Sequence, residues 1–67
     1  MRHMKKLVEA FNQGTRITND ELVALRDAMK VAAEALIGLG PYFATAYKEA
    51  NMIHIRTEEF CVARGIK

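Results

Sequence analysis

The chain has 67 residues, of which 51% are hydrophobic and 27% are charged, and its formal net charge is +2. A chain of this length holds a single domain, its lone Cys61 excludes a disulfide framework, and its weak, scattered positive charge does not favour a nucleic-acid partner. No apolar run approaches the ~18 residues of a membrane span and no export signal is found, so we expect a cytoplasmic protein with no membrane contact.

The first predicted helix runs from Met4 to Gln13. Apolar residues recur at the spacing of one helix face, namely at Met4, Leu7, Val8 and Phe11. Gly14 follows as the expected C-terminal cap, because glycine adopts the left-handed conformation at little cost. The dipeptide His3-Met4 is one that a common cloning site encodes, so residues 1–3 are a candidate expression scar within the single domain 1–67.

A capping box marks the start of the second predicted helix. Thr18 and Glu21 have the spacing at which each side chain accepts a hydrogen bond from the other residue's backbone amide. Ile17 and Leu22 stand where a hydrophobic staple would close around that start. We therefore expect a helix from Asn19 to Ile37, ended by the Gly38-Leu39-Gly40-Pro41 sequence.

The second helix carries apolar residues at the alternating three- and four-residue spacing of a coiled-coil-like bundle. These residues are Leu22, Leu25, Met29, Ala32, Leu36 and Leu39. A flanking face holds small residues, at Ala24, Ala28, Val31 and Ala35. Because so little of this helix is polar, we expect it to be central and contacted on more than one side.

The third predicted helix begins at Pro41 and runs to Arg64, with Gly65 as its stop. It repeats the same spacing at Phe43, Ala46, Ala50, Ile53, Thr57 and Phe60. The short break before it makes the two long helices antiparallel neighbours. The fold expected is all-α, a short N-terminal helix plus a long antiparallel αα-hairpin. Its predicted core is Leu25, Met29, Leu36, Phe43, Ile53 and Phe60.

The third helix has more apolar surface than one hairpin can cover. The surplus lies at Tyr42, Tyr47, Met52, Ile55 and Val62. Either the first helix or a second chain must cover these residues, and pairing of two hairpins into a four-helix bundle is the simplest symmetric solution. We therefore expect a homodimer, and we expect these residues to form the interface with the second chain or with another macromolecule.

His54, Glu58 and Cys61 are spaced so that one face of the third helix presents three potential zinc ligands. Metal sites usually draw ligands from two elements, and no second cluster stands elsewhere in the sequence. Cys61 and His54 are also ~10 Å apart along the helix axis, too far for a nucleophile–base pair. The sequence therefore predicts no metal, no cofactor, no small-molecule substrate and no catalytic residue.

Several capping features resemble those of short helical accessory proteins encoded by phages and prophages. They are Lys5-Lys6, Asn12-Gln13-Gly14, Thr18 to Leu22, and Gly38-Leu39-Gly40. This resemblance implies a non-enzymatic protein–protein interaction module, a phage-type regulator that modulates a host protein. A fainter resemblance, over Asn19 to Leu36, is to small nucleoid-associated modulators of the Hha type. It supports the alternative, a transcriptional or nucleoid regulator that acts on DNA directly or through a DNA-bound partner.

Overall fold

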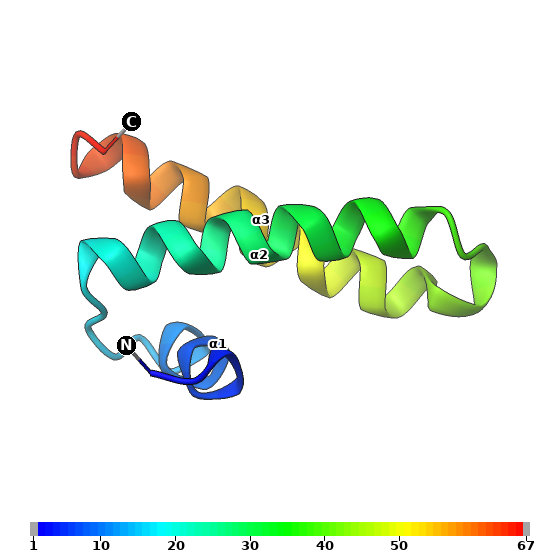
Figure 1. Cartoon of the computed structure of the whole chain (residues 1–67), viewed down its shortest axis with the longest axis horizontal. Helices are drawn as coiled ribbons and strands as arrows, with labels where there is room; N and C mark the ends of the chain where they lie inside the picture. The colour runs from blue at the N-terminus through cyan, green and yellow to red at the C-terminus, as the bar shows by residue number, and fades with distance from the viewer. Residues whose placement is uncertain (1, 67) are drawn as a thin grey trace.

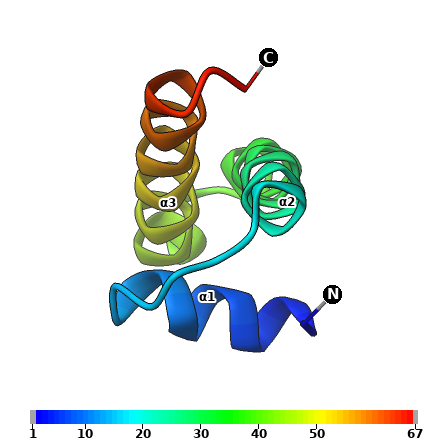
Figure 2. The same ribbon diagram turned by 90° about the vertical axis from the view of Figure 1, so that its left-hand side faces the viewer.

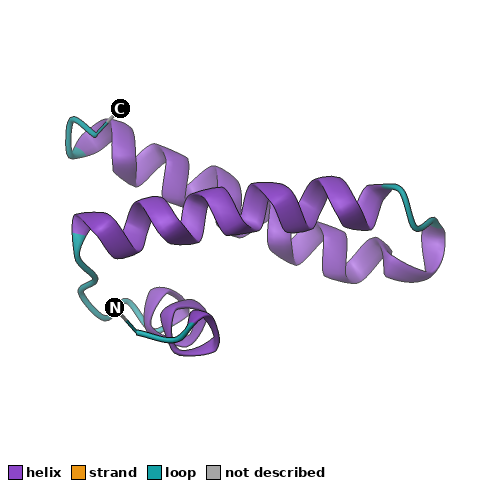
Figure 3. Cartoon of the chain, viewed as in Figure 1, coloured by secondary structure: helices purple, strands orange, loops and turns teal. Residues whose placement is uncertain are grey.

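The computed structural model describes residues 2–66, and within that range it contains helices and no strand (Figures 1 and 3). The α-helices are α1 (Met4–Asn12), α2 (Asn19–Ile37) and α3 (Ala44–Ala63), and a 3₁₀ turn, η1 (Pro41–Phe43), precedes α3. The prediction of an all-α fold with a short first helix and a long hairpin is confirmed. The third helix differs in one respect, because its first turn is the separate η1.

The start of α2 has the hydrogen bonds that the sequence predicts. The Glu21 amide donates to Thr18 Oγ1 at 3.1 Å, and the Thr18 amide donates to Glu21 Oε1 at 3.0 Å. Ile17 and Leu22 are both buried in the same core cluster. The capping box therefore fixes both where α2 begins and how the preceding segment enters the core.

Glycines in the left-handed region end the first and third helices. Gly14 has φ 75° and Gly65 has φ 72°. The amide of the following residue then reaches back to the last turn, from Thr15 to the Ala10 carbonyl at 2.9 Å and from Ile66 to the Cys61 carbonyl at 2.8 Å. This is the Schellman arrangement, and at the end of α3 it brings Ile66 against the hydrophobic core.

Helices α2 and α3 pack against each other as a hairpin, and α1 lies across its open end (Figures 1 and 2). The core is at that open end, where all three helices and the linker before α2 contribute. Its buried members are Leu7, Ala10, Phe11, Ile17, Leu22, Leu25 and Cys61. The closed end consists of the two long helices alone, so the hydrophobic residues there have fewer neighbours to cover them.

The prediction of the core is wrong at two positions. Phe43 is 43% exposed and Phe60 is 46% exposed. Phe43 lies in η1, before α3 begins, so its side chain is not on the α-helical seam. At the other end of α3 the buried position is Cys61, and Phe60 instead turns toward Phe11 of α1.

The other predicted core residues lie where the sequence places them, to different extents. Leu25 is completely buried. Met29 and Ile53 are half-buried and pack against the core cluster, and Leu36, nearer the closed end, is also half-buried. Burial along the seam therefore decreases from the end that α1 covers to the end that it does not.

In the part of the chain that the structure describes, no helix combines the length and the hydropathy that crossing a membrane requires.

Candidate functional site

The residues predicted to form an interface remain accessible, although they do not form one continuous patch. Tyr42 is 97% exposed at the closed end. Met52, Ile55 and Val62 are exposed along α3, and none of them is covered by α1. Tyr47 is half-buried.

Ile55 and Val62 lie on the face of the hairpin opposite α1. Helix α1 packs on α3 near Ile53, which joins the core, and Phe60, whose ring contacts Phe11. Two residues along a helix correspond to a rotation of about 200°, so Ile55 and Val62 point away from α1. The two side chains border one shallow hollow, together with Glu58 and Glu59.

Tyr47 lies eight residues before Ile55, about 80° away around α3, on the side of that helix that borders α2. It lines a hollow of about 170 Å³ between α2 and α3, together with Ile37 and His54. Ile37 is 65% exposed and was not among the residues predicted from sequence. The uncovered face therefore runs along both long helices, with apolar side chains contributed by each.

The three potential metal ligands of α3 are separated by burial. Cys61 is buried in the core, His54 is half-buried and Glu58 is exposed. Over residues 2–66, no group of three or more His, Cys, Asp and Glu side chains is close enough together to hold a metal ion. The three residues do share one face of α3, but that face lies at the edge of the contact with α2, so one of them is buried and another is in solvent.

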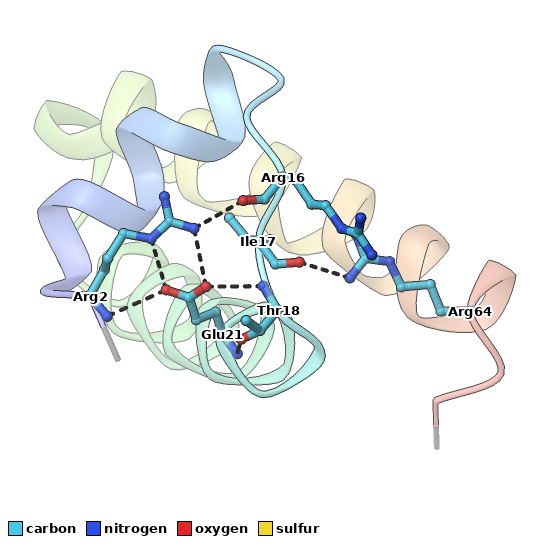
Figure 4. Close-up of polar contacts among 6 residues, drawn as sticks. All are labelled: Arg2, Arg16, Ile17, Thr18, Glu21 and Arg64. Carbon is cyan, nitrogen blue, oxygen red and sulfur yellow. Dashed lines mark hydrogen bonds and ion pairs between the residues drawn. The ribbon is translucent and has the colours of Figure 1, made fainter.

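A cluster of polar contacts lies at the start of α2 (Figure 4). Arg2 Nε donates to Glu21 Oε2 at 2.9 Å, and Arg2 Nη2 donates to Glu21 Oε1 at 3.1 Å and to the Arg16 carbonyl at 3.1 Å. Together with the capping box, these bonds use both oxygens of Glu21. This cluster ties the N-terminal segment, the linker and α2 together, which is a structural role.

The same bonds hold the pKa of Glu21 far below its ordinary value. The largest cause is the hydrogen bond from the Arg2 side chain, followed by the bond from the Thr18 backbone amide. Both favour the ionised carboxylate. Glu21 therefore stays charged in the folded chain and is unsuited to act as a general acid or base near neutral pH.

A groove of about 330 Å³ opens between α1, the linker and the C-terminal half of α3. Its apolar lining includes Phe11 and Phe60, whose rings meet edge to face with their centroids 5.8 Å apart. Its basic lining consists of Arg16, Arg56 and Arg64. An apolar floor beside a basic rim can receive a group that is both hydrophobic and anionic.

Neutral groups position two of the three groove arginines. Arg64 Nη1 donates to the Ile17 carbonyl and to Asn19 Oδ1, both at 3.1 Å. The Arg56 guanidinium stacks over the Phe11 ring, 4.9 Å from its centroid. Figure 4 shows the side chains of Arg16 and Arg64 extending toward each other from separate segments.

Sequence reasoning missed this groove. One signal was available, because Arg56, Phe60 and Arg64 recur every four residues and so share a helix face. The assignment of Phe60 to the core concealed it. Arg16 carries no comparable signal, since only the path of the linker brings it to α3.

Comparisons with models of protein families, with curated protein sequences and with solved structures found no match to this chain.

Proposed function

We propose that this chain is a non-enzymatic helical interaction module that works as a homodimer, in which two hairpins pair through the faces opposite α1. The observation that carries the proposal is the exposure of Ile37, Ile55 and Val62 on that face. Of these, Ile55 and Val62 border one hollow together, and neighbouring exposed apolar residues rimmed by polar ones mark interaction sites. Here Glu58 and Glu59 border Ile55 and Val62, as the polar rim of an interface does.

The exposed area supports association. A folded monomer of 7.6 kDa is expected to expose roughly 4,300 Å², whereas this chain exposes 4849 Å². The surplus of about 550 Å² is of the same order as the ~800 Å² that each partner buries in a standard interface. Because α1 occupies the other side of the hairpin, pairing through the opposite face requires no rearrangement of the core.

A dimer of this kind would form a four-helix bundle with an α1 on each outer side. In keeping with the resemblance to phage accessory proteins, we propose that the dimer regulates by binding another protein. It would do so through surfaces that dimerisation leaves free.

Sedimentation velocity over a range of protein concentrations tests the dimer. We expect the wild-type chain to sediment as a dimer, and a double variant with Ile55→Glu and Val62→Glu to sediment as a monomer with unchanged helicity. The matched control is Val31→Glu. Val31 is also exposed, but it lies six residues from Ile37, about a third of a turn away around α2. A wild-type monomer, or a dimer that the double variant leaves intact, would refute the proposal.

A further inference from the structure

The groove between α1 and α3 has an excess of positive charge close to an apolar floor. Within residues 2–66, the ion pairs involve Arg2, Lys6 and Arg26. The groove arginines take part in none of them. The positioning partners of Arg56 and Arg64 are an aromatic ring, a carbonyl and an amide oxygen, which orient the two guanidinium groups without cancelling their charge.

Like charges held close together raise the electrostatic potential between them, and an anion lowers the energy of such a cluster. The neighbouring hollow, which Arg16 and Arg64 also border, has two acidic residues in its lining, Asp20 and Glu21, and Glu21 pairs with Arg2. No acidic residue lines the groove itself. The charge pattern therefore selects an anionic ligand.

The floor requires that the ligand also have an apolar part. Phe11 and Leu22 are buried beneath the groove, while the Phe60 ring is half exposed into it. A ligand that covers this ring removes apolar surface from water at roughly 25 cal/mol per Å². Carboxylates of the ligand on either side of that apolar part would then form charge-assisted hydrogen bonds with the groove arginines.

The size of the groove distinguishes between macromolecular partners. Its volume of about 330 Å³ is at the lower end for ligand pockets, enough for one large side chain and its neighbours. Nucleic-acid binding depends on phosphate contacts spread along a backbone, whereas these three arginines surround one small groove. A peptide anchor with acidic neighbours fits better.

We propose that this groove binds an acidic peptide segment of a partner protein, with one aromatic or large aliphatic side chain against Phe60 and its flanking carboxylates on Arg16, Arg56 and Arg64. The inference rests on the proposed interaction function and names the class of partner. The groove lies on the α1 side of the hairpin, so dimerisation through the opposite face leaves it open.

The test is an NMR titration of the full-length, ¹⁵N-labelled chain at low ionic strength. The probe is the acetylated and amidated peptide Asp-Glu-Phe-Glu-Asp. We expect saturable shifts of the amides of Phe11, Gly14, Thr15, Ile17 and Phe60. A peptide with serine in place of phenylalanine should lose most of the affinity, because it lacks the anchor.

Two arginine variants separate a specific groove from general basicity. Arg56→Gln should weaken binding of the probe about tenfold, the loss expected for one charge-assisted contact. The control is Arg26→Gln, which removes the same charge from an arginine that pairs with Asp27 outside the groove. The control variant should bind like the wild type.

Three results with the peptide and the variants would overturn the inference, and a fourth would come from a nucleic-acid probe. The three are no saturable binding up to millimolar peptide, equal binding of the serine peptide, and equal weakening by both arginine variants. Tighter binding of oligothymidine at the same amides would overturn it in favour of nucleic acid. Repeating the titration on the double variant at Ile55 and Val62 keeps the two proposals apart, since a monomer with an intact groove should still bind the probe.

Discussion

The replacement of Leu25 by alanine tests the idea that stability is concentrated at the open end of the hairpin. The Leu25 side chain has no exposed surface. It belongs to the cluster in which α1 residues such as Leu7 and Phe11 pack against α2 and α3. Leu25→Ala would leave a cavity there that three elements border, and the helix backbone would resist its collapse.

The expected loss is a large part of the total stability. Leucine-to-alanine changes in cores cost about 2–5 kcal/mol, and a chain of 67 residues has roughly 3–10 kcal/mol in all. Because neighbouring Leu7 and Leu22 are also fully buried, we expect a loss in the upper half of the ~2–5 kcal/mol range, at least about 3.5 kcal/mol. The variant should then be marginally folded or unfolded at room temperature.

Urea unfolding followed by circular dichroism at one fixed protein concentration measures this loss. Leu39→Ala is the matched control, since Leu39 is 58% exposed in the turn at the closed end and should lose less than about 1 kcal/mol. A loss below about 1 kcal/mol for Leu25→Ala, or equal losses in the two variants, would show that the core does not lie where the structure places it.

Two further changes act on local structure. Because the pKa of folded Glu21 is depressed, its contribution to stability is present above the unfolded value of about 4.3 and is lost as the pH falls below it. Between about pH 6 and pH 3, urea unfolding should therefore show a greater loss for the wild type than for Glu21→Gln, and equal losses would contradict the Arg2 pairing. Gly65→Ala, at φ 72°, should lower the free energy of unfolding by about 1 kcal/mol. Gly38→Ala, at φ −76° with an ordinary 3.6 Å contact, should change it little or raise it; a larger loss at Gly38 would refute the capping argument.

Local signals in the sequence predicted the helices, because helix ends are set by a few neighbouring residues. The Thr18–Glu21 box needs nothing beyond its own turn, and α2 begins at Asn19 and ends at Ile37 as expected. Likewise, Gly65 stops α3 for a reason internal to its backbone. These features depend on contacts between residues only a few positions apart, so the sequence alone is enough to predict them.

The burial of individual residues on α3 could not be predicted in the same way. Phe60 and Cys61 are adjacent, and a strict seven-residue repeat favours Phe60 as the buried one. The position of α1 reverses this, because Phe60 packs against the Phe11 ring of α1, outside the hairpin, and Cys61 occupies the buried position instead. That choice depends on where a segment some fifty residues earlier in the sequence lies.

Phe11 connects the core to the proposed peptide groove. It is buried in the cluster that holds α1 on the hairpin, and it also supports Arg56 and Phe60 at the groove. A ligand that binds the groove therefore binds only molecules in which α1 is docked. By mass action, a ligand at 100 times its dissociation constant stabilises such a state by about 2.7 kcal/mol. For so small a chain this is a substantial share of its stability, so occupation of the groove and folding of α1 must be coupled.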